Sequence, residues 1–329
     1  GGQNLSYVKA GTGSLTLGNT GNIYLGNTRI SNGTLRLGAD EVIPDGSTTA
    51  VATTTLASAA STTVTAPTAN LYPGMTITGG SAPATITSIT SATAFVASTA
   101  QTISSGTNLT FSIARGNVVI DPAASVTATF DLNGRTETIN GLIATSAGNA
   151  VITNTAVGAA SLTFGANNAA VTINSTGGGS ATISGALSLT KIGTATATIA
   201  SGQTLTYTGS TNVTGGTLTI ASALTGTTAL SSIGDGSILN LNGLISVPAS
   251  INSVTVGAGA FLSFLDGVGT PISNLTTLNL GSGSGTANLS LDLGTTSDTL
   301  TTSVAAAIAN TIRINLSSAA GLLDNTAYN

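Results

Sequence analysis

The side chains of this sequence offer little material for catalysis or metal binding. It contains no histidine and no cysteine, which removes catalytic triads, thiol nucleophiles and the usual zinc and iron sites. The remaining candidates are carboxylates: Asp40, Glu41 and Asp45 lie close together in the sequence, and Asp292 lies near Asp298. Two carboxylates at the right separation act as acid and base in glycosidases, so these groups must be weighed.

A turn role explains these carboxylates more simply. Aspartate side chains commonly accept hydrogen bonds from nearby backbone N–H groups. A sugar-cleaving site would also be expected to use aromatic platforms, and the chain has no tryptophan. Calcium at Asp40, Glu41 and Asp45 would be expected in an aspartate-rich loop or a GGxGxD repeat, and neither is present. The sequence therefore favours a non-enzymatic protein without a cofactor or a resident metal.

The composition points to many short strands. Charged residues make up 5% of the 329 residues and aromatic residues 3%, while 42 glycines interrupt alternating small apolar and hydroxyl residues. This pattern is typical of an all-β chain with tight turns. The seven basic residues are scattered singly, which argues against nucleic acid or anionic lipid as a partner. Polar residues interrupt every apolar run, so membrane insertion of this segment is not expected.

Two stretches repeat one pattern. Asn27–Leu37 (NTRISNGTLRL) and Ser210–Ile220 (STNVTGGTLTI) share a β-branched run, a glycine turn and the letters GTL. Matching lysine, tyrosine, glycine and leucine residues recur around each GTL in the same order. Repetition of short strands in this way is the signature of stacked coils. The marks of the first copy are Lys9, Tyr24, Gly26, Gly33 and Leu35, and those of the second are Lys191, Tyr207, Gly209, Gly216 and Leu218. We interpret all ten as turn and core residues, and the two lysines as covers of a coil corner.

The first copy resembles the autotransporter-associated β-strand repeat. The string LSYVKAGTGSLTLGNTGNIYLGNTRISNGTLRLGA is similar to its pattern LxKxGxGTLxLxGxNxYxGxTxIxxGTLxxG, and the second copy departs from it at Ala195, Ala197 and Ile199. The two matches cover about a quarter of the chain. The resemblance implies a right-handed parallel β-helix in an exported bacterial surface protein. It implies no catalytic or ligand site.

An inserted segment interrupts the repeat. After PDGS (Pro44–Ser47) the expected next turn, DLNG, is delayed until Asp131–Gly134. We therefore predict a solenoid over residues 1–47 and 114–329 and a small barrel-like or sandwich-like β-domain over residues 48–113. The string LYPGMTITGGSAPATITSI inside it resembles a motif of small β-modules in large bacterial surface proteins. The solenoid part should contain roughly 12 to 13 coils of ~20 residues.

The inward positions of these coils should hold the repeat leucines and isoleucines. These are Leu15, Leu17, Ile30, Leu35, Ile199, Val213 and Leu218. The segment from Ser303 to Asn310 fits either a helical turn or a buried strand.

Threonine-rich strands raise one further alternative. Thr194, Thr196 and Thr198, and also Thr127 and Thr129, resemble the flat TxT arrays of ice-binding solenoids. An ice-binding face needs threonines on one side at one period over many coils. In the sequence they shift along the strands and mix with serine and asparagine, which favours hydrogen-bonded ladders along the stack.

The ends of the sequence resemble interior coils. GGQNLSYV already alternates like a strand, and GLLDNTAYN reads like the middle of a coil, which favours an excerpt of a longer chain over a processed one. Uncapped solenoid ends are able to pair with another chain. We therefore expect a structural protein of an extracellular filament, stalk or surface layer, with end-to-end self-association or neighbouring repeats as partners. The alternative is an adhesin-like passenger that binds surface glycans.

Overall fold

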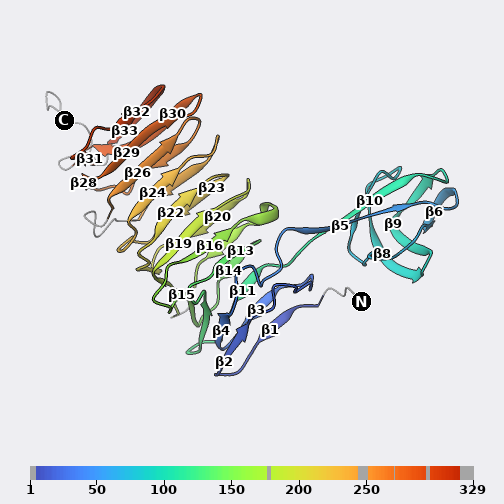
Figure 1. Cartoon of the computed structure of the whole chain (residues 1–329). Coiled ribbons are helices and arrows are strands. Elements are labelled where there is room, and N and C mark those ends of the chain that lie inside the picture. Colours follow the sequence, from blue (N-terminus) through green and yellow to red (C-terminus); the bar gives the residue numbers. More distant parts are fainter. Residues whose placement is uncertain (1–4, 176–178, 244–250, 270, 294–296, 319–329) are drawn as a thin grey trace. The chain divides into compact units, whose positions relative to one another are not determined.

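The chain folds almost entirely into β-strands. The computed structural model describes residues 5–175, 179–243, 251–269, 271–293 and 297–318 (Figure 1). Within these ranges the one helical element is a short 3-10 helix, η1 (Ala166–Asn168). Parallel strands stack into a β-solenoid of about twelve turns, which confirms the predicted all-β fold class. The right-handed sense of the coil stays a prediction.

Three parallel sheets form the solenoid. The first sheet contains, in stacking order, β1 (Tyr7–Lys9), β3 (Thr28–Ile30), β11 (Val118–Ile120), β14 (Leu142–Ala144), β17 (Val171–Ile173), β20 (Thr196–Ile199), β23 (Thr217–Ile220), β25 (Ile238–Leu241), β27 (Phe261–Ser263), β30 (Thr286–Leu293) and β33 (Thr311–Ser318). The second contains β2 (Ser14–Leu17), β4 (Gly33–Leu37), β12 (Thr127–Asp131), β15 (Asn149–Asn154), β18 (Ala181–Gly185) and β21 (Thr204–Leu205). The third contains β13 (Thr136–Ile139), β16 (Ala160–Phe164), β19 (Leu187–Lys191), β22 (Ser210–Val213), β24 (Ala229–Ser232), β26 (Ser253–Gly257), β29 (Thr277–Ser282) and β32 (Ala307–Ile308). A two-stranded sheet of β28 (Pro271–Leu275) and β31 (Thr299–Thr302) completes the set.

The core of the solenoid consists of columns of apolar side chains. Alternate residues of a strand point to opposite faces, and parallel pairing in register places each inward residue on its equivalent in the next turn. One column of the second sheet runs through Leu15, Leu35, Phe130, Ile152, Ile183 and Leu205. Each fully buried side chain of this size contributes roughly 1.5–3 kcal/mol, so the stack is stabilised turn by turn.

Five of the seven predicted inward residues are fully buried, and the first two are not. Ile30, Leu35, Ile199, Val213 and Leu218 are at most 1% exposed. Leu17 is partly exposed, and Leu15 is 44% exposed although it faces the core column. The prediction of burial was wrong for Leu15 because β2 is the first strand of its sheet, and no described strand stacks on it from the outer side.

The solenoid continues across a long interruption in the sequence. In the first sheet β3 pairs directly with β11, where Val118 lies opposite Thr28. In the second sheet β4 pairs with β12, where Phe130 lies opposite Leu35. The strands between them in the sequence take no part in these two ladders.

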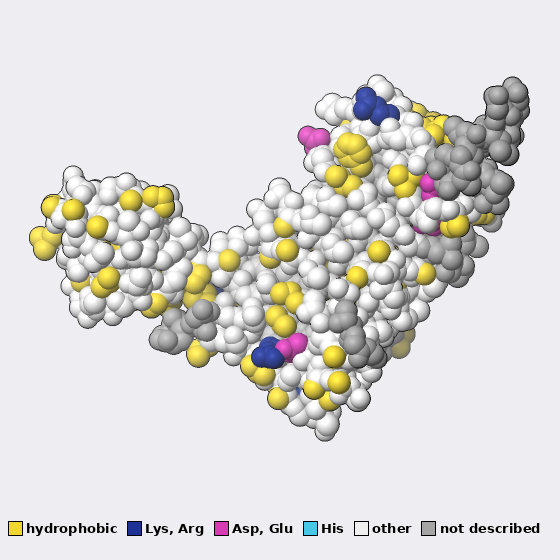
Figure 2. Space-filling view, turned by 180° about the vertical axis from the view of Figure 1, so that it is seen from behind, with side chains coloured by type: hydrophobic (Ala, Val, Ile, Leu, Met, Phe, Trp, Pro, Cys, Tyr) yellow, Lys and Arg dark blue, Asp and Glu magenta, His cyan; other side chains and the backbone are white. Residues whose placement is uncertain are grey.

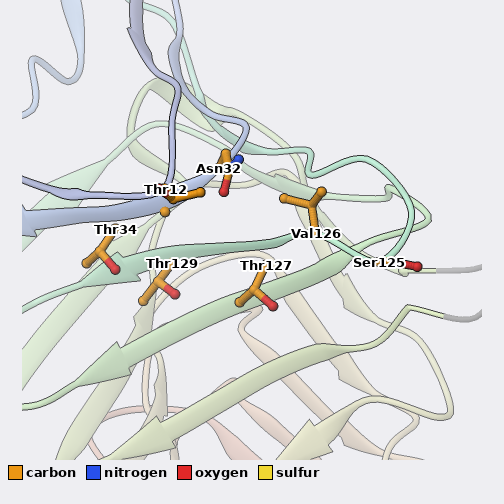
Figure 3. A pocket seen from close by; sticks show the side chains of 8 residues that line it. Thr12, Asn32, Thr34, Ser125, Val126, Thr127 and Thr129 are labelled. Atoms are coloured by element: carbon orange, nitrogen blue, oxygen red, sulfur yellow. The ribbon is translucent and has the colours of Figure 1, made fainter.

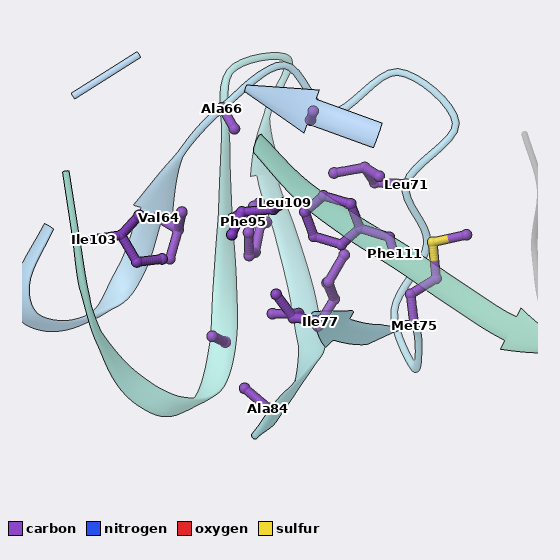
Figure 4. Close-up of a cluster of buried hydrophobic side chains, with 13 residues drawn as sticks. Val64, Ala66, Leu71, Met75, Ile77, Ala84, Phe95, Ile103, Leu109 and Phe111 are labelled. Atoms are coloured by element: carbon purple, nitrogen blue, oxygen red, sulfur yellow. The ribbon is translucent and has the colours of Figure 1, made fainter. Parts of the chain in front are cut away.

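These intervening strands form an antiparallel sheet of their own. Its order is β5 (Ser47–Thr53), β10 (Asn108–Ala114), β7 (Thr76–Thr78), β8 (Ala84–Ser91), β9 (Ala94–Ile103) and β6 (Ser58–Thr65). The sheet encloses a separate apolar cluster in which Phe95 and Phe111 meet edge to face at 5.4 Å (Figure 4). Contacts divide the chain into this small unit, which holds Pro44–Gly116, Gly1–Tyr7 and Ile23–Asn27, and a solenoid unit with the remainder. The domain boundaries at residues 48 and 113 stay a prediction.

The segment from Ser303 to Asn310 contains a strand and no helix. The strand is β32, which pairs with β29 through Ala307 and Ile308. Both of its residues are exposed, so the expectation of a buried strand was wrong in that respect.

Removal of residues 48–113 tests whether the solenoid folds without them. We expect a chain in which a short turn replaces these residues to keep one cooperative thermal transition, because the β3–β11 and β4–β12 ladders lie outside the deleted range. Circular dichroism during heating measures this. A control deletion of β16 should abolish the transition, because β16 links β13 to β19. Loss of cooperative melting in the first deletion would contradict the prediction.

Candidate functional site

Both lysines of the chain are buried at corners of the solenoid. Lys191 ends β19, at the corner between the third and first sheets, and is 0% exposed. Its Nζ donates hydrogen bonds to the carbonyl oxygens of Ile192, of Gly193 at 2.9 Å and of Gly215 at 3.2 Å. Gly215 belongs to the next turn, so one ammonium group holds two turns together.

Lys9 makes the same set of contacts at a different corner. It ends β1, between the first and second sheets, and is 4% exposed. Its Nζ donates to the carbonyl oxygens of Ala10 at 3.2 Å, Gly11 at 2.7 Å and Asn32 at 2.9 Å. An ammonium group has three N–H donors, and each arrangement uses all of them. We call these two arrangements the lysine corners.

The charge of a lysine corner is balanced by carbonyl dipoles. Neither lysine forms an ion pair with a carboxylate in the described part of the chain. Burial lowers the pKa of Lys191 below its ordinary value, because removal from water disfavours the charged form. Each ammonium group is nevertheless held by hydrogen bonds to three carbonyl oxygens, one of them in the next turn. The lysine corners therefore have a structural role.

The repeat glycines occupy matching positions beside the lysines. Gly33 and Gly216 have φ values of 65° and 61°, a conformation that favours glycine. A Cβ atom at Gly33 would lie 2.5 Å from the oxygen of Gly11, and one at Gly216 would lie 2.6 Å from that of Gly193. Both glycines therefore let the next turn approach the carbonyl groups that the lysine binds.

The second glycine pair and the leucines also match. A Cβ atom at Gly26 would lie 2.8 Å from the oxygen of Leu5, and one at Gly209 would lie 2.4 Å from that of Leu187. The repeat leucines, Leu35 and Leu218, are both 0% exposed.

The two repeat tyrosines differ. Tyr207 is fully buried, and its hydroxyl lies 2.6 Å from Thr211 Oγ1, which lies 3.2 Å from Thr227 Oγ1. Burial raises the pKa of Tyr207 to about 12, although the hydrogen bond with Thr211 acts in the opposite direction. Tyr24 is only partly buried and stacks on Tyr7, with ring centroids 6.0 Å apart.

The first group of candidate carboxylates binds backbone amides. Asp40 Oδ1 accepts a hydrogen bond from the N–H of Thr136 at 2.9 Å. Glu41 accepts one from the N–H of Thr138 at 3.1 Å and one from its hydroxyl at 3.0 Å. Asp45 belongs to the small unit, whereas Asp40 and Glu41 belong to the solenoid unit. Asp40 and Glu41 thus bind backbone N–H groups of β13.

The sequence patterns did not indicate a further carboxylate, Glu137, which binds the backbone just after Asp40 and Glu41. It is 0% exposed and accepts hydrogen bonds from the N–H groups of Val42 at 3.0 Å and Ile43 at 2.8 Å. Its inward position in β13 was a signal available in the alternation TETI.

Asp292 and Asp298 are close together and buried. Asp292 Oδ2 accepts a hydrogen bond from the N–H of Gly267 at 2.7 Å, and Asp298 Oδ2 accepts one from the N–H of Asp292 at 2.7 Å. Asp292 thus binds a backbone N–H group of the bend at Gly267, and Asp298 binds one of β30. Among the described residues no group of three or more acidic side chains is arranged to hold a metal ion.

Asp131 is a buried carboxylate with several hydrogen bonds, and no pattern in the sequence singled it out. It is 0% exposed, accepts bonds from Asn133 and Thr155, and pairs with Arg36 at 2.9 Å. Burial alone would raise the pKa of Asp131, but the bonds from Thr155, Asn133 and Arg36 outweigh it and lower the pKa. This cluster holds the corner after β12.

One hollow of the solenoid unit is open and lined by small side chains. It has a volume of about 420 Å³ and lies beside Asn32, Thr34, Val126 and Thr129 (Figure 3). It contains no carboxylate or basic group among its lining residues, so it offers no acid or base for catalysis.

Comparison with known proteins gives no identification. No protein-family model matches the chain, and no curated protein matches it. The resemblance to the autotransporter-associated repeat therefore stays a prediction. No helix within the described ranges is long and apolar enough to cross a membrane.

Replacing Lys191 by methionine tests the lysine corner. We expect Lys191→Met to lower the free energy of unfolding by about 2 kcal/mol, because buried carbonyl oxygens lose their donor. Denaturant titration measures the change. Arg313→Met is the matched control, since it removes an exposed positive charge and should change stability by less than about 0.5 kcal/mol. Equal stability of the two variants would show that the corner contacts contribute nothing.

Ionisation of the buried Tyr207 hydroxyl should lower the free energy of unfolding at alkaline pH. The pKa of Tyr207 is about 12 in the folded chain, against an ordinary value of 10.0, so its stabilising effect is complete below pH 10 and is lost between about pH 10 and 12. Tyr207→Phe should be less stable than the parent at pH 8 and should lose less stability between pH 9 and 11.5. Denaturant titrations at these pH values measure both differences. Parallel alkaline losses in the two proteins would contradict the assignment.

Proposed function

We propose that this chain is a non-enzymatic structural protein, a β-solenoid subunit or segment of an extracellular filament, stalk or surface layer. Its turns stack along one axis, and neighbouring units complete its end turns. The partners are further copies of the chain or neighbouring repeats of a longer polypeptide. Localisation at a bacterial cell surface is part of the proposal and depends on the resemblance to the autotransporter-associated repeat.

The exposed core positions at the two terminal described levels carry the proposal. In β33, Ile314 pairs with the buried Leu289 of β30 and Leu316 pairs with the half-buried Leu291, yet Ile314 and Leu316 are 55% and 59% exposed. At the other level Leu15 is 44% exposed. An inward column that ends in exposed leucine and isoleucine gains stability when another turn covers it, and the open strand edge provides the hydrogen bonds.

The bonding of the carboxylates also supports a structural role. Asp40 and Glu41 accept hydrogen bonds from backbone N–H groups of β13, Asp298 accepts one from β30, and Asp292 accepts one from the bend at Gly267. A general acid or base in a glycosidase instead faces an open cleft with its partner carboxylate across the substrate.

The adhesin alternative has less support. A glycan-binding face would be expected to show a cluster of exposed aromatic side chains. Among the described residues Phe261 is the one exposed large aromatic side chain, at 39%. We therefore place surface glycans second to self-association.

Concentration-dependent assembly tests the proposal. We expect the chain to form linear polymers in sedimentation velocity and in negative-stain electron microscopy as its concentration rises. Leu316→Asp should prevent polymer formation, because it places a charge at the open end of the core column. Val157→Asp is the control: Val157 lies between β15 and β16, away from both terminal levels, is fully exposed at 104%, and its replacement should leave assembly unchanged.

A chain that stays monomeric at high concentration would show that self-assembly is wrong. The neighbouring turns would then have to come from the same polypeptide. Assembly that both aspartate variants retain would show that the terminal levels are not the contact.

A further inference from the structure

The first sheet of the solenoid has one inward column that runs from its first strand to its last. The N–H of Ser31 donates to the carbonyl oxygen of Lys9 at 2.9 Å, which places Lys9 opposite Ile30 in β3. From Ile30 the column passes in register through Ile120, Ala144, Ile173, Ile199, Ile220, Leu241, Phe264, Leu291 and Leu316. Strands β1 and β33 therefore hold two levels of the same column, at opposite ends of the sheet (Figure 1).

One edge of β1 faces no described strand. The N–H and C=O groups of one residue point to one side of a strand, and those of the next residue point to the other side. The carbonyl group of Lys9 faces β3, so the N–H and C=O groups of Val8 face the open side. The side chain of Val8 is 55% exposed. This edge is able to accept another strand.

The outer edge of β33 has the matching orientation. The N–H of Phe264 in β27's turn donates to the carbonyl oxygen of Ser290 at 3.0 Å, so Ser290 faces that turn. Its neighbour Leu291 therefore faces β33, where it lies opposite Leu316. Opposite residues of a parallel ladder face the same way, so the N–H and C=O groups of Leu316 and Ile314 face the open side. Their side chains are 59% and 55% exposed.

The first strand of the third sheet, in contrast, is closed by the chain itself. The carboxylates of Asp40 and Glu41 accept hydrogen bonds from the N–H groups of Thr136 and Thr138, at 2.9 and 3.1 Å. The N–H of Glu41 in turn donates to the carbonyl oxygen of Thr136 at 3.1 Å. This segment occupies the outer edge of β13 in place of a strand. Closure of this kind prevents an edge from pairing with another chain, so assembly has to use the edges that stay open.

We propose that β33 of one copy pairs in parallel with β1 of the next copy, with Leu316 opposite Lys9. This contact rests on the proposed end-to-end assembly and specifies its strands and its register. In this register the N–H of Leu316 donates to the carbonyl oxygen of Val8, and the N–H of Val8 donates to that of Ile314. Leu316 then packs on the aliphatic stem of Lys9, whose ammonium group is already bound at its corner. The exposed end of the column at Leu316 becomes buried.

Charge does not determine this register. Lys9 and Arg313 are the charged residues of β1 and β33, and both are positive. Charged side chains are also sparse on the surface in view in Figure 2. The contact therefore depends on backbone pairing and on burial of apolar side chains.

Disulfide cross-linking between copies tests the register. The chain has no cysteine, and the proposed register places the exposed residues Val8 and Asn315 opposite each other. Val8→Cys and Asn315→Cys chains, one of them isotope-labelled, should form mixed covalent dimers on oxidation, because opposite Cα atoms lie about 4.8 Å apart. Mass spectrometry measures these dimers. In the matched control Arg313→Cys replaces Asn315→Cys, which separates the Cα atoms by about 8 Å, and about ten times less mixed dimer should form.

A proline at position 8 tests the backbone pairing independently. Val8→Pro should stop polymer growth, because it removes the N–H group that faces the next copy. The ladder of the solenoid itself loses no bond, since proline is tolerated where the N–H of an edge strand faces outward. Val8→Ala keeps the N–H group and should polymerise like the parent. Sedimentation velocity measures assembly, and circular dichroism melting shows that both variants fold.

The outcomes separate this contact from the assembly on which it rests. Filaments that form without the cross-link between positions 8 and 315, or with equal cross-linking of the shifted pair, would overturn the contact and leave the proposed assembly intact. Unimpaired polymerisation of a folded Val8→Pro chain would overturn the contact as well. A parent chain that forms no polymer at high concentration would overturn the proposed self-assembly, and this contact with it.

Discussion

The corners between sheets decide whether one turn of this chain can stack on the next. Within a sheet every backbone group finds a partner in the ladder, but at a corner the strands diverge and carbonyl oxygens lose those partners. A buried carbonyl without a donor costs free energy comparable to a lost hydrogen bond. Lys191 solves this problem with one ammonium group that binds carbonyl oxygens of two successive turns. Other corners use aspartate or asparagine, as at Asp131 and Asn154.

This constraint explains the unusual composition. Because corners and columns repeat, the interior needs small aliphatic residues and the surface needs only short hydroxyl and amide side chains. The few charged groups then make particular contacts. Lys9 and Lys191 bind carbonyl oxygens at corners. Asp131 pairs with Arg36, and Glu137 accepts a hydrogen bond from the N–H of Val42. A chain built this way has few side chains that could act as an acid or a base.

The repeat pattern predicted the solenoid and its apolar columns. The pattern succeeded because Gly33 and Gly216, or Leu35 and Leu218, meet the same local requirements in both copies. It failed where a property depends on the neighbouring turn: Leu15 faces the core but has no described strand above it, and Tyr24 differs from Tyr207 in burial. The placement of Lys9 and Lys191 at different corners depends on turn lengths that a local pattern does not show.

A distance between two spin labels on the third sheet tests the stacking most directly. The chain has no cysteine of its own, so cysteines introduced at Thr163 and Asn279 would carry the only labels. These residues lie five turns apart in one outward column. Pulsed electron spin resonance should give a single narrow distance of about 24 Å, since each turn advances by about 4.8 Å. A broad distribution, or a distance that does not grow when the second label is moved from Thr255 to Asn279, would contradict the solenoid and everything inferred from its register.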